Sequence, residues 1–268
     1  MMAAGRMDPI DLTGKRVVVT GASSGLGLAM TEALLRAGAS VAMASRPGAK
    51  LDTEVERLVA AGYDAYKLPL DVRSEESVSD AVTWVQEKWG RLDVLVNNAG
   101  IGMRTVNPRF MIEPLPFFEV TPDGFRNVID TNLTGYFLVA RGFAPMMVKQ
   151  RHGKIINISM NHETMRRRGF VPYGPSRAGA ESLSYIMAED LLPYGVTVNI
   201  LLPGGATDTG MIPEELKAQI KVPLLRPEVM AESIVFLASE QSDGITGERI
   251  VATEFSQWYA IRFHDHTP

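Results

Sequence analysis

The chain has 268 residues, contains no cysteine and carries a formal net charge of −4. The lack of cysteine excludes disulfides, thiolate metal sites and a cysteine nucleophile, and the remaining potential ligands do not predict a metal site. The small charge gives no sign of the basic surface that nucleic acid or an anionic membrane would need. The first fifteen residues lack the apolar run of a signal peptide, and no apolar stretch is long enough to span a bilayer. We therefore expect a cytoplasmic protein.

Seven short apolar segments alternate with segments of helical spacing. Most are nearly continuous hydrophobic runs, which predicts parallel strands covered by helices on both faces of the sheet. The predicted strands are Arg16–Thr20, Ser40–Ala44, Ala65–Leu70, Asp93–Asn97, Lys154–Ser159, Val196–Leu202 and Arg249–Val251. The alternation continues without a linker or a repeat. It predicts an α/β protein with one doubly wound Rossmann-type domain over residues 1–268 and a sheet of about seven strands.

The longest predicted helix covers residues 121–150. Thr121 is suited to the N-cap and Pro122 to the first helical position, while Pro145 predicts a kink or an early end. Another long helix is expected after Gly174. Residues 1–13 are expected to form a flexible N-terminus.

A glycine-rich turn joins the first predicted strand to a helix. In TGASSGLG (Thr20–Gly27), Gly21 permits a tight turn, Gly25 lets the backbone approach a diphosphate, and Gly27 allows close packing of the helix on the strand. The helix N-terminus would then face the phosphates of a dinucleotide with its free N–H groups. The residues expected to contact the dinucleotide here are Gly21, Ser23, Ser24, Gly25, Leu26 and Gly27.

The end of the second predicted strand indicates which dinucleotide is bound. A carboxylate there would bind the adenosine ribose hydroxyls and repel a 2′-phosphate, but the chain has Ser45 and Arg46. Because a guanidinium suits a phosphate, NADP(H) is favoured over NAD(H). The alternative is that Arg46 is an ordinary exposed turn residue.

Six motifs occur in the chain in the order in which the classical short-chain dehydrogenase/reductases have them. The chain therefore resembles that family over nearly its whole length. They are the TGASSGLG turn, Asp71-Val72, Asn97-Asn98-Ala99-Gly100, Asn132 in TNLTGYF, Tyr173 in Tyr-Gly-Pro-Ser-Arg, and Pro203-Gly204. The resemblance implies further cofactor contacts from Asp71, Val72, Asn98, Ala99, Gly100, Tyr173, Arg177, Pro203 and Gly204, and from Thr207 or Thr209. It also implies a homodimer or homotetramer joined through the helices after Thr121 and Gly174.

The resemblance further implies that Tyr173 is the acid/base of a reaction that interconverts a carbonyl and a secondary alcohol, supported by Asn132. A free phenol has a pKa of about 10, so a nearby cation must stabilise the phenolate. The family uses a lysine for this, but Arg177 stands at its position. Arginine keeps the charge, but it is planar and does not lose its proton.

The second departure concerns the serine with which the family binds the substrate oxygen. Its position falls on Met160, which offers no donor, and a bulge or one-residue shift at the strand end could present Ser159 or Asn161 instead. Without a replacement donor, catalysis would be badly handicapped. Two hypotheses follow. The chain is a working NADP(H)-dependent oxidoreductase, or it binds the cofactor with weak or no turnover, as a sensor or a non-catalytic subunit.

Two irregular segments are expected on the substrate side of the cleft. Residues 103–120 are rich in proline and apolar side chains, and residues 205–223 follow the sixth predicted strand. The apolar content of these loops favours a small-molecule carbonyl or alcohol substrate that is at least partly apolar.

Overall fold

The structure, a computed structural model, describes residues 9–212, 214–217 and 223–263. Its sheet contains seven parallel strands in the order β3-β2-β1-β4-β5-β6-β7. The strands are β1 (Arg16–Thr20), β2 (Ser40–Ser45), β3 (Ala65–Pro69), β4 (Val94–Asn97), β5 (Gly153–Ile158), β6 (Val196–Leu202) and β7 (Arg249–Val251). This confirms the predicted doubly wound α/β fold. The strand order reverses between β1 and β4, where proteins with open α/β sheets bind their ligands.

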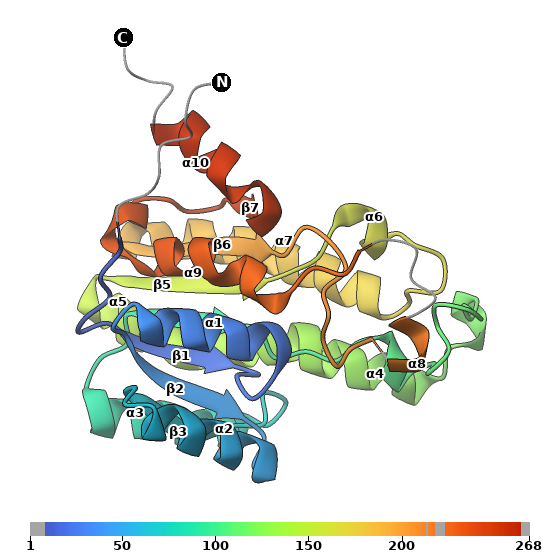
Figure 1. Ribbon diagram of the computed structural model, residues 1–268, viewed down its shortest axis with the longest axis horizontal. Helices are drawn as coiled ribbons and strands as arrows, with labels where there is room; N and C mark the ends of the chain where they lie inside the picture. The colour runs from blue at the N-terminus through green and yellow to red at the C-terminus, as the bar shows by residue number, and fades with distance from the viewer. Residues whose placement is uncertain (1–8, 213, 218–222, 264–268) are drawn as a thin grey trace.

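Helices cover both faces of the sheet (Figure 1). They are α1 (Gly25–Arg36), α2 (Ala49–Ala60), α3 (Glu75–Trp89), α4 (Pro122–Ile129), α5 (Gly135–Gln150), α6 (His162–Met165), α7 (Tyr173–Leu191), α8 (Glu214–Lys217), α9 (Ala231–Ala238) and α10 (Phe255–Phe263). None of the helices in the described part of the chain is both long and apolar enough to span a membrane.

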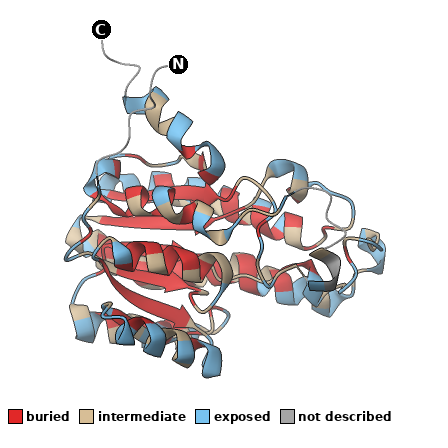
Figure 2. Ribbon diagram, viewed as in Figure 1, coloured by how far each residue is buried: buried red, intermediate tan, exposed pale blue. Residues whose placement is uncertain are grey.

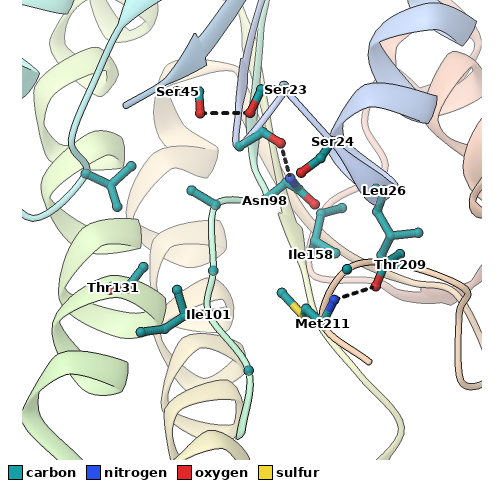
Figure 3. A pocket seen from close by; sticks show the side chains of 18 of the residues that line it. Ser23, Ser24, Leu26, Ser45, Asn98, Ile101, Thr131, Ile158, Thr209 and Met211 are labelled. Carbon is teal, nitrogen blue, oxygen red and sulfur yellow. Dashed lines mark hydrogen bonds between the residues drawn. The ribbon is translucent and has the colours of Figure 1, made fainter. Parts of the chain in front are cut away.

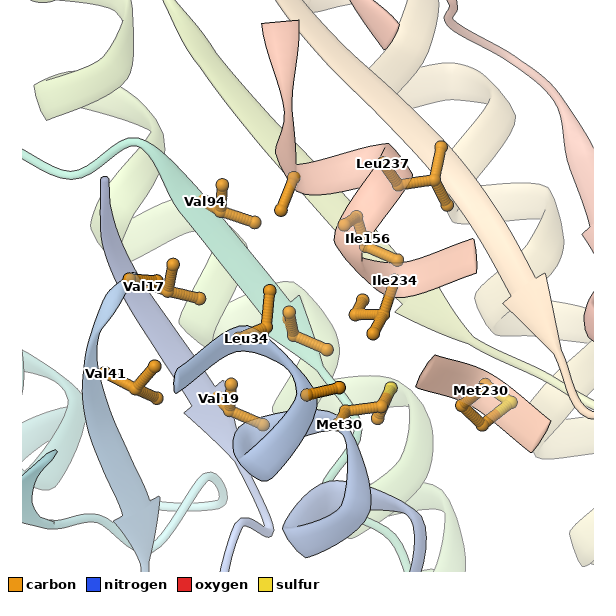
Figure 4. Packing of buried hydrophobic residues seen from close by; sticks show 14 of the residues in the cluster. Val17, Val19, Met30, Leu34, Val41, Val94, Ile156, Met230, Ile234 and Leu237 are labelled. Carbon is orange, nitrogen blue, oxygen red and sulfur yellow. The ribbon is translucent and has the colours of Figure 1, made fainter. Parts of the chain in front are cut away.

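Two apolar clusters lie on opposite faces of the sheet, and the strands are buried between them (Figure 2). On one face, α1 and α9 pack on the sheet, with Leu34 and Ile234 among the buried side chains (Figure 4). On the other face, α3, α5 and α7 contribute Val85, Phe143 and Ala188. Burial on both faces explains why the strands read as continuous apolar runs.

The helix predicted over residues 121–150 is interrupted at a different place from the one expected, near residue 130 and not at Pro145. Thr121 is the N-cap, and its hydroxyl accepts a hydrogen bond from the Gly124 N–H at 3.1 Å. The chain does not end its helix at Pro145, because α5 continues to Gln150. Pro145 has no N–H, so the carbonyl of Arg141 lacks its usual amide donor. Both residues are exposed to water. The irregularity instead lies at the π-helical turn Asp130–Thr134 between α4 and α5.

The N-terminal segment is anchored before β1. Leu12 is fully buried, and its N–H donates to the Ala37 carbonyl at 2.7 Å. Of the segment expected to be flexible, residues 1–8 lie outside the described residues, while residues 9–13 lead into this buried contact.

Candidate active site

A cleft of about 560 Å³ lies at the carboxyl ends of β1, β4 and β5 (Figure 3). Its floor is formed by the turns that leave these strands, and its mouth lies between residues 102–105 and 209–211. Parallel strands place their carboxyl ends at one edge, so motifs far apart in the sequence meet there. The cleft therefore collects most of the residues that the sequence analysis selected.

The glycine-rich turn forms one end of the cleft. Gly21 and Gly25 have φ angles of +67° and +55°, in the left-handed region that favours glycine. A Cβ at Gly27 would collide with the Gly21 carbonyl and the Asn98 side chain. Ser24 is the N-cap of α1 but makes no side-chain capping bond, so the first N–H groups of the helix stay available to an anion. All six predicted contact residues of this turn line the cleft.

The next part of the cleft is basic. Ser45 and Arg46 line it, and the Ser45 hydroxyl lies 3.1 Å from that of Ser23. Lys50, in the first turn of α2, lines the same region and was not selected from the sequence. Its position four residues after Arg46, across a Pro-Gly turn, was the available signal. Neither cation forms an ion pair within the described residues.

Asp71 and Val72 follow β3 and line the cleft as expected. The Asp71 carboxylate is bound by Arg73, with an Nη2–Oδ2 distance of 2.6 Å and an Nε–Oδ1 distance of 3.0 Å. This hydrogen bonding lowers the pKa of Asp71 below its usual value. Arg73 also lines the cleft, so the neutralised Asp71 side chain does not repel an anionic ligand.

The turn after β4 forms the floor. The Thr20 hydroxyl accepts hydrogen bonds from the N–H groups of Asn98 and Ala99 at 2.9 and 3.0 Å, which fixes this turn against β1. Gly100 follows, and a Cβ there would collide with the Arg177 guanidinium. Asn98, Ala99 and Gly100 all line the cleft.

The phenol of Tyr173 faces the other end of the cleft. Tyr173 is the first residue of α7, and its hydroxyl lies 3.9 Å from the Met211 sulfur. Its ring packs against a small apolar cluster that contains Phe110 and Phe170. The hydroxyl therefore faces the cleft while the ring is held by the surrounding loops.

Arg177 lies one helical turn after Tyr173 and is only 3% exposed. Its Nη1 donates to the Tyr136 hydroxyl at 2.6 Å and to the Ile158 carbonyl at 3.0 Å. Its Cζ lies 5.4 Å from the ring centroids of both Tyr136 and Tyr173. The guanidinium is thus within cation–π range of both phenol rings.

The ionisation of these groups follows from their burial. Burial would lower the pKa of Arg177, but the two phenols, Tyr136 first, more than offset it and the pKa of Arg177 is raised. Burial raises the pKa of Tyr136, although the guanidinium acts in the opposite direction. Arg177 is therefore a permanent buried cation, and no carboxylate among residues 9–212, 214–217 and 223–263 forms an ion pair with it.

Asn132 supports the wall of the cleft and does not line it. It lies in the π-helical turn and is fully buried. Its Oδ1 accepts from the Ile101 N–H at 2.8 Å, and its Nδ2 donates to the Ile101 carbonyl at 3.0 Å and to the Ser176 hydroxyl at 3.1 Å. One side chain thus links the turn after β4 to α7.

Both residues expected to donate a hydrogen bond to the substrate oxygen already donate to other groups of the protein. Ser159 lines the cleft, but its hydroxyl donates to Glu181 at 2.6 Å. Asn161 is not among the cleft residues, and its Nδ2 donates to the Gly204 carbonyl at 3.1 Å.

Glu181 and Arg249 were not predicted from the sequence, although Glu181 lies one helical turn after Arg177 on α7 and that spacing was the available signal. The Arg249 Nε contacts both carboxylate oxygens of Glu181, at 3.0 and 3.2 Å, and its Nη2 donates to the Met160 carbonyl at 2.8 Å. Glu181 is buried, and this pair fixes the backbone that follows β5.

The segment after β6 contributes fewer cleft residues than expected. Thr209 lines the cleft, whereas Pro203, Gly204 and Thr207 do not. Thr207 is buried, because it forms a bridge with Leu225 and its hydroxyl donates to the Gly205 carbonyl.

The two predicted substrate-side loops meet at the mouth of the cleft. The Arg104 guanidinium donates to the Gly210 carbonyl, and Met103 is buried behind it. Within the predicted segment 205–223, residues 213 and 218–222 lie outside the described residues. Among the residues that are described, no group of three or more potential ligands is arranged to hold a metal ion.

Comparison with known proteins adds a family to this geometry. A family model described as short chain dehydrogenase matches residues 15–219. A 3-oxoacyl-acyl-carrier-protein reductase of Aquifex aeolicus is 34% identical over 249 residues, which are 90% of this chain and 96% of the relative. A gluconate 5-dehydrogenase of Gluconobacter oxydans is 30% identical over 250 residues, which are 90% of this chain and 94% of the relative.

A solved structure of similar fold is a gluconate 5-dehydrogenase from Burkholderia cenocepacia in complex with NADP and tartrate. It is 27% identical, has a TM-score of 0.80, and the alignment covers 93% of this chain and 98% of that one. The family model covers more than half of the chain, and its relatives match almost from end to end. The protein belongs to the short-chain dehydrogenase/reductase family of oxidoreductases.

Proposed function

We propose that this protein is an NADP(H)-dependent oxidoreductase that interconverts a carbonyl and a secondary alcohol, with Tyr173 as the acid/base. The observation that carries the proposal is the buried Arg177 guanidinium, 5.4 Å from the Tyr173 ring, in a cleft that begins with a diphosphate-binding turn. A fixed cation beside a phenol favours the phenolate, which an acid/base operating near neutral pH requires.

The residues present fit a dinucleotide with a 2′-phosphate. The turn at Gly21 and Gly25 leaves room and free N–H groups for the diphosphate. Arg46 and Lys50 lie beside the adenosine end without an acidic partner among the described residues, and a phosphate would supply the missing negative charge. The complex of the Burkholderia relative with NADP supports the same preference.

The residues of the chain divide the work of the reaction. NADP(H), when bound, supplies or takes up the hydride. In reduction Tyr173 donates its hydroxyl proton to the carbonyl oxygen of the substrate, and in oxidation its phenolate takes the proton of the alcohol. Arg177 stabilises the phenolate electrostatically and does not itself move a proton. Asn132 holds the wall between the turn after β4 and α7.

The names of the relatives support the substrate class. A 3-oxoacyl thioester has a ketone that is reduced, and gluconate has secondary hydroxyls that are oxidised. Both pairs belong to the carbonyl and secondary alcohol chemistry that a phenol acid/base serves. We also propose that the protein is cytoplasmic and homodimeric or homotetrameric.

One observation favours the alternative, a cofactor-binding protein with weak or no turnover. The Ser159 hydroxyl donates to Glu181 and the Asn161 amide donates to the Gly204 carbonyl, so neither is free to bind a substrate oxygen. If no donor replaces them, only Tyr173 would polarise the carbonyl, and one lost oxyanion donor costs about 10²–10³ in rate.

The test combines cofactor binding with turnover. We expect NADPH to bind at least tenfold more tightly than NADH, and Arg46→Ala to weaken NADPH binding by about 10–100-fold, since a charge-assisted hydrogen bond contributes about 1.5–3 kcal/mol. NADH binding should stay unchanged in that variant. The matched control is Arg36→Ala, another exposed arginine, at the end of α1 away from the cleft.

Turnover is then measured on a panel of 3-oxo esters, sugar acids and simple ketones. Tyr173→Phe should abolish turnover while NADPH still binds through the diphosphate turn and Arg46. Tight NADPH binding with no turnover of any compound would favour the non-catalytic alternative. Equal affinities for NADPH and NADH, unaffected by Arg46→Ala, would contradict the assigned phosphate site.

A further inference from the structure

Tyr136 is a fully buried phenol at the start of α5, and the proposed acid/base reaction does not use it. It is the nearest polar neighbour of Arg177, whose Nη1 donates to the Tyr136 hydroxyl at 2.6 Å. The same hydroxyl donates its own proton to the Ile158 carbonyl at 3.1 Å. The Tyr136 oxygen is therefore held from two sides and directs a lone pair at the guanidinium.

The guanidinium needs such a partner because of its shape. Arginine is longer than lysine and presents planar N–H groups, so its charge lies near a chosen atom only if the plane is fixed. Arg177 has no acidic partner within the described part of the chain, and its Nε makes no hydrogen bond although it is buried. Its orientation is held at Nη1, which bonds to the Tyr136 hydroxyl and the Ile158 carbonyl.

We propose that Tyr136 is a positioning residue: its hydroxyl and ring hold the Arg177 guanidinium over the Tyr173 phenol, and so adapt the site to arginine. The proposal rests on the function proposed above for Tyr173. The Arg177 Cζ lies 5.4 Å from each of the two ring centroids, so one guanidinium contacts both phenols, and its Nη1 is held by the Tyr136 hydroxyl.

The π-helical turn explains how α5 supplies this phenol. Asn132 within the turn and Tyr136 just after it are both buried, and both side chains bond toward the region where β4, β5 and α7 meet. Gly135, between them, packs against Val72, where a Cβ would have no room. Asn132 and Tyr136 are four residues apart and share one helix face, so both polar side chains reach the back of the cleft.

Arg177 is the cation whose guanidinium contacts the Tyr173 ring. Other charged or titratable side chains around this end of the cleft are Arg104, Arg167, His162, Glu181 and Arg249. Arg104 bonds to the Gly210 carbonyl, Arg167 stacks on Phe170, and Glu181 is paired with both Arg249 and His162. In the described part of the chain, none of these five forms a hydrogen bond or an ion pair with Tyr136, so Tyr136→Phe removes none of their bonds.

The experiment measures the ionisation of Tyr173 through tyrosinate absorbance during a pH titration. Wild type and Tyr136→Phe are each compared with the same protein that also carries Tyr173→Phe, and the difference isolates Tyr173. Phenylalanine keeps the ring and removes only the hydroxyl, while Arg177 retains the Ile158 carbonyl. We expect the Tyr173 midpoint to rise by about one pH unit, which is a tenfold loss of preference for the phenolate.

The rescue arm uses Arg177→Lys. A lysine ammonium is not planar, so it needs no partner to orient it. Tyr136→Phe should therefore move the Tyr173 midpoint far less in the Arg177→Lys background than in the wild type. The two substitutions would then be non-additive in a double-mutant cycle. Tyr185→Phe, which removes an exposed hydroxyl from α7, is the matched control and should leave the midpoint unchanged.

The titration needs no substrate, so its outcome is independent of whether a substrate is found. A Tyr173 midpoint that does not move in folded Tyr136→Phe would overturn the positioning role, as would an equal shift with and without Arg177→Lys. If the midpoint moves as expected but no compound is turned over, the positioning role stands and the proposed function fails.

Discussion

The hydroxyl of Ser159 has a single proton, and in this structure that proton points to Glu181 at an oxygen–oxygen distance of 2.6 Å. Glu181 is buried and paired with Arg249, so it is an ionised acceptor and the bond is charge-assisted. Ser159 would have to give up this bond before it could donate to a carbonyl oxygen. That cost, about 1.5–3 kcal/mol, offsets most of what an oxyanion donor contributes.

We therefore expect Ser159→Ala to lower kcat/KM by at most about tenfold, less than the 10²–10³ loss seen for a dedicated oxyanion donor. Asn161→Ala provides the comparison, because its amide bonds to the Gly204 carbonyl outside the cleft. Steady-state kinetics on the best substrate of the panel would measure both. A loss above a hundredfold in Ser159→Ala would show that the hydroxyl turns to the substrate during the reaction.

At the scale of the element, the π-helical turn Asp130–Thr134 is held by Asn132, whose three hydrogen bonds link the Ile101 backbone to Ser176. Asn132→Ala would leave the Ile101 N–H and carbonyl without these partners. Each of the three lost hydrogen bonds contributes about 0.5–1.5 kcal/mol, so we expect a loss of about 2–4 kcal/mol in the free energy of unfolding. Chemical denaturation would measure it.

Thr134→Ala is the control for the Asn132 variant, since Thr134 lies in the same turn and its side chain makes no hydrogen bond among the described residues. It should change the free energy of unfolding by less than about 1 kcal/mol. Equal losses in the two variants would mean that the turn, and not the amide of Asn132, carries the stability.

The elements themselves were largely predictable because both faces of the sheet are buried. Apolar runs therefore predicted the strand bounds to within about one residue. The glycine-rich turn was predictable because only glycine fits its backbone angles and close contacts. The π-helical turn was not predicted, and the hydrogen bonds that Asn132 makes from it reach segments distant in sequence, which no local pattern reveals. Of the two outcomes expected at Pro145, the early end of the helix does not occur, because α5 continues to Gln150.

The candidate site shows the same division between local and distant causes. The positions of Tyr173, Arg177 and the diphosphate turn follow from motifs that are contiguous in sequence. The partners that decide their chemistry, Tyr136 and Glu181, are chosen by packing between elements. Nothing in the local sequence shows that the Ser159 hydroxyl already donates to Glu181 or that the Arg177 guanidinium contacts two phenols.

At the scale of the whole molecule, α5 and α7 present apolar side chains to solvent. Phe137 on α5 is 45% exposed and Ile186 on α7 is 57% exposed, and Leu192 and Tyr194, just after α7, are exposed as well. Large exposed apolar residues gathered on neighbouring elements are typical of an interface. Because a C2 dimer uses the same patch on both subunits, these helices could pair with their own copies.

We expect the purified protein to have two or four times the monomer mass of 29.3 kDa in sedimentation velocity. Ile186→Glu would place two like charges at the centre of such a pairing and bury them, so it should raise the dissociation constant at least about a hundredfold, equivalent to about 3 kcal/mol. Val59→Glu is the control, because Val59 is similarly exposed, at 50%, on α2. It should leave the mass unchanged. A wild-type protein that sediments as a monomer across the whole concentration range, or an Ile186→Glu variant that keeps the wild-type mass, would show that the apolar face of α5 and α7 is not the site of assembly.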